Sequence, residues 1–401
     1  MKTLLAIIIF FLMSLPRIGI AQESCDSYYQ CLGDYPSNAN PGYHEDVQGI
    51  THDDENWFIT QSDPDDSDPA ERSLWKIPAT YDLSSVSPNA DGVKRIILDE
   101  IPELASKGYN HFGDLTYYKN KKYDNKGYLV IPVTGGPVGI LAVFRSSDLG
   151  YVGYAELSAG SGWAAIDPDG NVYAQSEQNT KCLIYKLKWD LIPNEVKIYP
   201  MGMFTFRDES QNLLAINHQQ GGVITESGSL LYLVSGLYDD HYANDGINVF
   251  DLQTGRRVIR STNGDGLFNY EFHPGGWFDN RDEPEGITIW DLDDDQAPEA
   301  PKITGQLHVF MVDNDGSADE IYLKHYTQTI TVDGINGNDR DWGRPFDPKK
   351  TVIGAVNLIE HYHWNGARIK IKTGSYPETL TISLRMQLLS DGGLVKIGTT
   401  R

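Results

Sequence analysis

Carboxylates crowd into the stretch DEPEGITIWDL, residues 282–292, where Glu283 and Glu285 stand directly before a glycine and a short apolar run. Two carboxyl groups held close together acquire different pKa values, so that one can act as a general acid while the other stays ionised. The same oxygens could instead ligate a metal ion. Polar groups at such a position could also simply satisfy the end of a strand. The choice depends on what the rest of the chain brings to the same place.

Four other segments share the layout of this stretch, each opening with a small residue and a short apolar run that is followed by strands rich in aromatic and β-branched residues. The five first strands start near residues 49, 113, 163, 222 and 286, which are 64, 50, 59 and 64 residues apart. Short strands joined by Asp, Asn and Gly turns, without helical periodicity, indicate an all-β repeat protein.

These repeats predict a β-propeller over residues 46–328, built from four-stranded antiparallel blades. Five blades can be counted, and a divergent stretch leaves room for a sixth. The region resembles secreted β-propeller proteins in general and matches no single family of them. A β-sandwich with accidental similarity between its strands is the alternative.

A propeller brings the first strand of every repeat to its central axis. Neighbouring blades crowd there, which accounts for the recurrent glycines. Residues just before these strands would then converge at one mouth of the central channel. The residues predicted to meet there are Asp46, Gln48, His111, Asp114, His218, Gln220, Glu283 and Glu285.

Three kinds of chemistry are open to this ring of residues. Ca²⁺ takes about six to eight oxygen ligands, and Glu283, Glu285, Asp46 and His111 are the candidate metal ligands. Glu283 and Glu285 are the candidate catalytic pair. In the third alternative the ring only satisfies strand ends or binds a sugar or another ligand by hydrogen bonds, and the high aromatic content, 11 %, modestly favours sugars. The candidate ligand-binding residues are Asp46, Gln48, His111, Asp114, His218 and Gln220.

The N-terminus has the pattern of a secretory signal peptide over residues 1–21. Lys2 gives a positive start, residues 4–15 are apolar, and small residues surround position 21. In the following segment, 22–45, Cys25 and Cys31 are placed to form a disulfide in an oxidising compartment. Cys182 is left over in an apolar strand and is expected to be a buried small residue.

The net charge is −23, from 33 basic and 56 acidic residues. Such a surface repels phosphate backbones and anionic lipids, so neither nucleic acid nor a membrane surface is an expected partner. It attracts cations, Ca²⁺ among them. No stretch after the leader is long and apolar enough to insert into a membrane.

Residues 329–401 carry a different pattern. They contain the motif Val332-Asp333-Gly334, a Pro345-Phe346 turn, one short helix over 351–360 and a strand with Gly374 and Tyr376 at its bend. This segment resembles the opening of a right-handed parallel β-helix of pectate-lyase-like proteins. The resemblance implies no catalytic residue, because those of the family lie on later rungs. Since a solenoid needs about three repeats to bury its core, the segment is expected to pack on the propeller or be completed by another chain.

The sequence therefore favours an extracellular propeller that binds carbohydrate or another surface polymer at the channel mouth. A metal-dependent hydrolase of glycosidic or ester bonds, with Glu283 and Glu285 at its centre, is the second hypothesis. A structural surface protein is the third.

Overall fold

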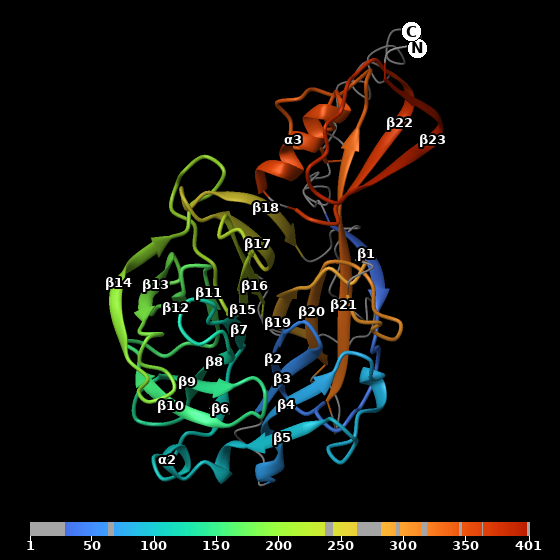
Figure 1. The fold of residues 1–401 in the computed structure, drawn as a ribbon. Coiled ribbons are helices and arrows are strands. Elements are labelled where there is room, and N and C mark those ends of the chain that lie inside the picture. Colours follow the sequence, from blue (N-terminus) through green and yellow to red (C-terminus); the bar gives the residue numbers. More distant parts are fainter. Residues whose placement is uncertain are drawn as a thin grey trace, which may run out of the picture.

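The computed structural model describes residues 29–62, 68–236, 244–262, 282–293, 297–313, 319–344, 347–362 and 364–398. The predicted signal peptide, Cys25 and the side chain of Cys31 lie outside the described residues. In the part that is described, no helix is long and apolar enough to cross a membrane. The fold is an all-β propeller, as predicted, with an additional C-terminal module (Figure 1).

Four regular blades follow one another along the chain, each an antiparallel sheet made from consecutive strands. The first blade contains β2 (Val47–His52), β3 (Asn56–Ser62), β4 (Arg72–Pro78) and β5 (Lys94–Ile97). The second contains β6 (His111–Phe112), β7 (Thr116–Lys119), β8 (Gly127–Thr134), β9 (Ile140–Arg145) and β10 (Tyr151–Glu156). The third contains β11 (Ala164–Ile166), β12 (Asn171–Gln175), β13 (Lys181–Leu187) and β14 (Ile198–Thr205). The fourth contains β15 (Gln219–Ile224), β16 (Leu230–Ser235), β17 (Gly246–Asp251) and β18 (Arg257–Thr262). A short helix, α2 (Pro102–Ala105), joins the first two blades.

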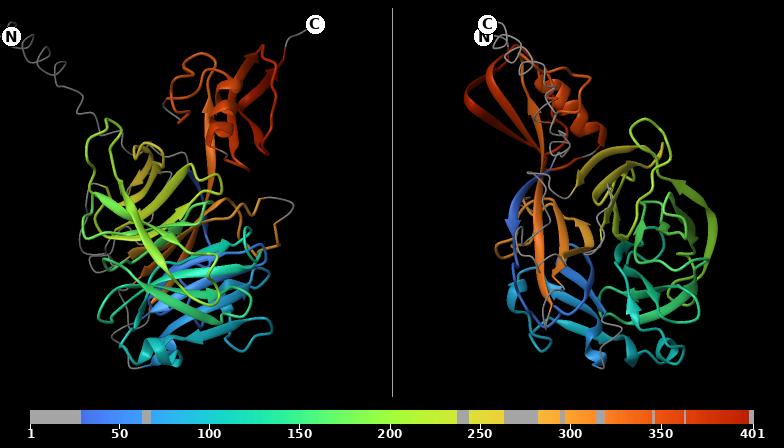
Figure 2. Two further views of the ribbon diagram at one scale, coloured as in Figure 1. Left: turned by 60° about the vertical axis from the view of Figure 1, so that its left-hand side comes forward. Right: turned by 180° about the vertical axis from the view of Figure 1, so that it is seen from behind.

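The fifth sheet is built differently, so the structure has four regular blades and the prediction of five blades is wrong. Its consecutive strands are only three: β19 (Asp282–Ile289), β20 (Leu307–Asp313) and β21 (Glu320–Val332). The outer position is taken by β1 (Tyr29–Asp34), which pairs antiparallel with β21 across residues 324–328. The sequence pattern overlooked this because the closing strand lies about 290 residues from its partner. The N-terminal strand thus closes the ring (Figure 2).

The long strand β21 continues out of this sheet into the C-terminal module. Its last residues, 329–332, pair in parallel with β22 (Arg368–Tyr376), and β22 pairs in parallel with β23 (Gln387–Ile397). The helix α3 (Val352–Tyr362) packs over these strands. The described residues therefore form a small parallel sheet with one helix, which alone does not establish a β-helix.

The apolar core runs without interruption from the propeller into this module. One cluster of buried residues includes Val249 of β17, Val309 of β20, Ile330 of β21 and Val356 of α3. Burial of apolar surface is the main force that holds such elements together. The module is consequently fixed to the propeller by shared core as well as by the continuous strand.

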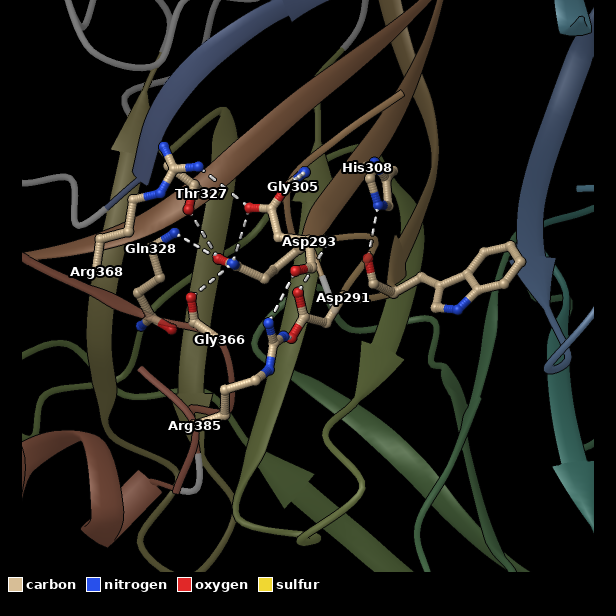
Figure 3. Close-up of polar contacts among 11 residues, drawn as sticks. Asp291, Asp293, Gly305, His308, Thr327, Gln328, Gly366, Arg368 and Arg385 are labelled. Carbon is tan, nitrogen blue, oxygen red and sulfur yellow. Dashed lines mark hydrogen bonds and ion pairs between the residues drawn. The ribbon is translucent and has the colours of Figure 1, made fainter. Parts of the chain in front are cut away.

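Polar contacts reinforce the junction (Figure 3). Arg385 forms an ion pair with Asp291 and donates a hydrogen bond to the carbonyl of Asp293 at 2.8 Å. Arg368 forms a second ion pair with Asp293, with nitrogen and oxygen 3.2 Å apart. The side-chain amide of Gln306 donates to the carbonyl of Gly366 at 2.8 Å. Both aspartates follow β19, so the inner strand of the fifth sheet leads directly into this interface.

Candidate functional site

The first strands of the repeats surround the axis of the propeller, as the sequence predicted. β19 lies against β2 on one side and β15 on the other, and β15 lies against β11. In the second blade the inner strand is interrupted between β6 and β7. Asp114 occupies that gap.

Asp114 is fully buried, with an exposed fraction of 0 %. Its Oδ1 accepts hydrogen bonds from the amides of Ile50 and Leu115 at 3.2 and 3.0 Å. Its Oδ2 accepts from the amide of Gly222 at 2.9 Å. The backbone of Ile287 in β19 also lies beside this carboxylate. Burial raises the pKa of Asp114, and the backbone groups around its carboxylate act in the opposite direction.

The backbone of Asp114 extends this network to the third blade, because its amide donates to the carbonyl of Gly162 at 2.7 Å. One residue thus contacts all five sheets. The sequence predicted Asp114 as a ligand-binding residue at the channel mouth. The structure places it at the axis instead, where its oxygens already accept backbone amides. Its evident role is to hold the inner strands together.

Glycine is needed where these strands approach one another. A Cβ on Gly49 would lie 2.5 Å from the Cα of Asp114. A Cβ on Gly286 would lie 2.6 Å from the Cα of Gly49 and equally close to the amide nitrogen of Ile50. Real Cβ contacts are never this short with backbone atoms that cannot move. The explanation of the recurrent glycines by crowding between blades is therefore confirmed.

Glu283 and Glu285 lie together next to this axis, and only 6 % and 5 % of their surfaces are exposed. The side-chain amide of Gln220 donates to Glu283 at 3.1 Å and is 3.4 Å from Glu285. Burial and then the negative charge of Glu283 raise the pKa of Glu285 well above its usual range. The pair therefore retains one proton under conditions in which isolated glutamates are ionised.

Local backbone irregularities turn these side chains toward one another. Gln48 in β2 and Gln220 in β15 are each the extra residue of a β-bulge. A third bulge in β19 includes Glu285. A bulge changes the direction of a side chain and often borders a functional site. The inner strands β2, β15 and β19 thus each contain a β-bulge at an equivalent position.

Asp46 and His218 precede two of these bulges and share an unusual conformation. Their φ angles are +42° and +43°, in the left-handed region that side-chain-bearing residues seldom adopt. The negative charge of Asp46 contributes to the raised pKa of Glu285. The amide of Asp46 donates to the carboxylate of Asp319 at 2.8 Å. Asp319 is thus an acidic neighbour that the sequence pattern missed, because it precedes β21, the third strand of its sheet, and not an inner strand.

Of the predicted site residues, the structure joins Gln220, Glu283 and Glu285 by direct contacts and Asp46 by its charge. Gln48 and His111 are half-buried in the corresponding strands of the first two blades. Burial lowers the pKa of His111. Within the described ranges, no group of three or more His, Cys, Asp or Glu side chains is arranged to hold a metal ion.

Comparisons with known proteins add only the fold. The sequence matches no family model and no curated protein. Three similar solved structures are a tail fiber of Staphylococcus aureus phage P68, glutaminyl cyclase of Myxococcus xanthus and a calcium-binding regucalcin of Agrobacterium tumefaciens. Their sequence identities are 16 %, 10 % and 11 %, with TM-scores of 0.41, 0.43 and 0.38.

The matches cover 75 %, 75 % and 73 % of this chain, and 52 %, 96 % and 93 % of those chains. This chain thus spans about half the length of the tail fiber. The three structures named here give no support to the resemblance of the C-terminal segment to pectate lyases.

Proposed function

We propose that this protein is a ligand-binding propeller whose site is centred on Glu283, Glu285 and Gln220. The observation that carries the proposal is the pair of nearly buried carboxyl groups bridged by one amide. A carboxyl pair that keeps one proton offers both a donor and acceptors, and the amide of Gln220 adds further donor capacity.

The ligand class that suits this combination is polyhydroxylated, carbohydrate above all. A sugar hydroxyl donates and accepts, so adjacent hydroxyls can engage a carboxylate and an amide together. Because Glu283 and Glu285 are nearly buried, a ligand would first meet the half-buried Gln48 and Gln220 and would extend toward the carboxyl pair. The leader-like pattern of residues 1–21 supports an extracellular setting for such binding.

The geometry supports glycoside hydrolysis less well. Glycosidases separate their two carboxyl groups by about 5 Å or more, to leave room for the anomeric carbon or for a water molecule. The side-chain amide nitrogen of Gln220 lies 3.1 Å from Glu283 and 3.4 Å from Glu285, so it occupies space between them that the reacting sugar or the water molecule would need. Ca²⁺ would have to displace the shared proton, because metal ligands bind in their deprotonated form.

A glycan array, with the wild-type protein and the variants Glu285→Gln and Glu195→Gln, tests the proposal. Glu195 is exposed on another part of the propeller and serves as the matched control. Binding by the wild type and the control, with at least a tenfold loss in the Glu285 variant, supports the site. Glycan binding that survives Glu285→Gln unchanged refutes it. Release of reducing sugar from a bound glycan by the wild type alone favours the hydrolase, and a melting temperature that rises with Ca²⁺ favours the metal site.

The C-terminal module can be placed in the same context. We propose that β21, β22 and β23 are successive turns at the start of a parallel β-helix, since they pair in parallel and in order. The helix α3 would then cover its first end.

A further inference from the structure

Two histidines are buried side by side in the fifth sheet, outside the site described above. His308 of β20 and His325 of β21 are cross-strand partners, with exposed fractions of 0 % and 3 %. Their Nδ1 atoms are 2.8 Å apart. The Nε2 of His308 lies 2.9 Å from the carbonyl oxygen of Trp290, and the Nε2 of His325 lies 2.8 Å from that of Tyr35.

The number of N–H hydrogens on the two rings determines how many of these three contacts can be hydrogen bonds. A carbonyl oxygen only accepts, so both Nε2 atoms must carry hydrogen if both carbonyl contacts are hydrogen bonds. The contact between the Nδ1 atoms needs a third hydrogen. Two neutral imidazoles carry two hydrogens in total. The neutral pair therefore lacks one hydrogen bond, and the complete set requires a third proton and a buried positive charge.

The surroundings oppose such a charge. Lys324, next to His325 on β21, already forms an ion pair with Asp34 of β1, with nitrogen and oxygen 3.0 Å apart. His52 of β2, the other titratable neighbour, stacks on the ring of Trp290 at 4.2 Å. Burial lowers the pKa of both His308 and His325. A proton on the closed pair would thus be both desolvated and close to an existing cation.

The position of the pair links its protonation to closure of the ring. Tyr35 directly follows β1, and Gly33 and Asp34 of β1 pair with His325 and Lys324. If this end of β1 separates from β21, His325 loses its contact with Tyr35 and can reach water, where it takes up a proton readily. Acid therefore favours the separated state.

We propose that the His308–His325 pair is an acid-sensitive latch, which holds β1 against β21 while the two rings are neutral and releases it when the pair takes up a proton. Two histidines in such close contact bind protons in steps that belong to the pair and not to either ring alone. Mild acid would then open the propeller at its closure before the four regular blades lose their structure.

Hydrogen exchange of the full chain tests this latch. After correction for the intrinsic pH dependence of exchange, residues 29–35 should lose at least tenfold protection between pH 7 and pH 5, relative to β8 and β9. The double variant His308→Gln/His325→Gln should show no such change, since glutamine does not titrate there. The control His361→Gln, an exposed histidine of α3, should behave as the wild type.

Unchanged or increased protection of residues 29–35 in acid overturns the proposal, as does an equal loss in the double variant. If the double variant does not fold, the NMR titration of the wild-type imidazoles decides. Signals of His308 and His325 that titrate near pH 6.5, like exposed histidines, would contradict a buried neutral pair.

Discussion

Asp114 and Gly222 are 108 residues apart in the chain, yet the carboxylate of the first accepts the backbone amide of the second at 2.9 Å. This bond ties the second blade to the fourth across the axis. It is one of several hydrogen bonds by which the carboxylate of Asp114 links the inner strands of different blades. The stability of the ring should therefore depend strongly on this residue.

Replacing Asp114 with Asn should destabilise the fold by about 1–3 kcal/mol, the cost of leaving the amide of Gly222 without its acceptor. In the variant, the side-chain NH2 group of Asn would stand where a carboxylate oxygen now accepts a backbone N–H. Each buried donor that is left unsatisfied costs about 1–3 kcal/mol. Denaturant unfolding measures the difference. The exposed Asp169→Asn is the control and should change stability by less than about 0.5 kcal/mol. Equal losses of stability in the two variants would show that the carboxylate of Asp114 does not hold the inner strands together.

The variant Gly286→Ala should lose about 2–3 kcal/mol, because its Cβ would collide with the backbone of Gly49 and Ile50. Gly160→Ala is the matched control, since no atom lies within 4 Å of the position its Cβ would take. Thermal melting of both proteins shows the contrast. A Gly286 variant as stable as the control would mean that the blades do not crowd at the axis.

The carboxyl pair predicts a characteristic dependence on pH. The raised pKa of Glu285 means that the folded protein binds more protons than the unfolded chain above about pH 4.5, so this group makes stability fall as the pH rises. Glu285→Gln removes that contribution. We expect its stability relative to wild type, measured in denaturation curves, to increase as the pH rises above about 4.5, while Glu195→Gln shows no such increase.

The buried histidines make the stability of the fold rise with pH, which is opposite to the effect of Glu285. Burial lowers the pKa of His325 to about 4, against an ordinary value of 6.5, so the unfolded chain binds more protons within that interval. The free energy of unfolding should fall by about 3 kcal/mol from this group as the pH drops from 6.5 to 4. The His325→Gln variant should lack this loss. Denaturation at matched pH values in wild type and variant isolates it from the effect of Glu285.

Replacement of Arg385 with Met should loosen the C-terminal module without unfolding the propeller. The change leaves Asp291 without its ion pair and the carbonyl of Asp293 without a donor. The partly exposed site limits the cost to about 1–2 kcal/mol. Hydrogen exchange should quicken in β22 and β23 and stay constant in β8 and β9. Arg340→Met, at an exposed position, should alter neither region.

Much of the architecture was predictable because a propeller repeats its inner strand. Glycines such as Gly49 and Gly286 signalled these strands, and the collisions that an added Cβ would cause explain why. The number of regular blades was not predictable from local pattern, since β1 pairs with a strand near the other end of the chain. Non-local pairing of this kind leaves no trace in the spacing of residues.

The site was predicted in part for a similar reason. Glu283, Glu285 and Gln220 are adjacent because they precede equivalent strands, which their positions in the repeats indicated. Asp114 occupies a comparable position in sequence but points to the axis, because its inner strand is interrupted there. His308 and His325 lie in strands that read as ordinary apolar core. Their only signal was a histidine in each strand, and the cross-strand register that joins them appears only in three dimensions.

The thirteen residues of β21 belong to two structures at once: its first part is a propeller strand and its last four residues are the first strand of the C-terminal sheet. No linker separates the two, so a pull on the tail is transmitted along a single extended backbone into the ring. The hydrogen-bonded pairing of β21 with β20 and β1 would resist that tension, because the strands would have to slide past one another. Because one strand belongs to both parts, the C-terminal module should not rotate freely relative to the propeller.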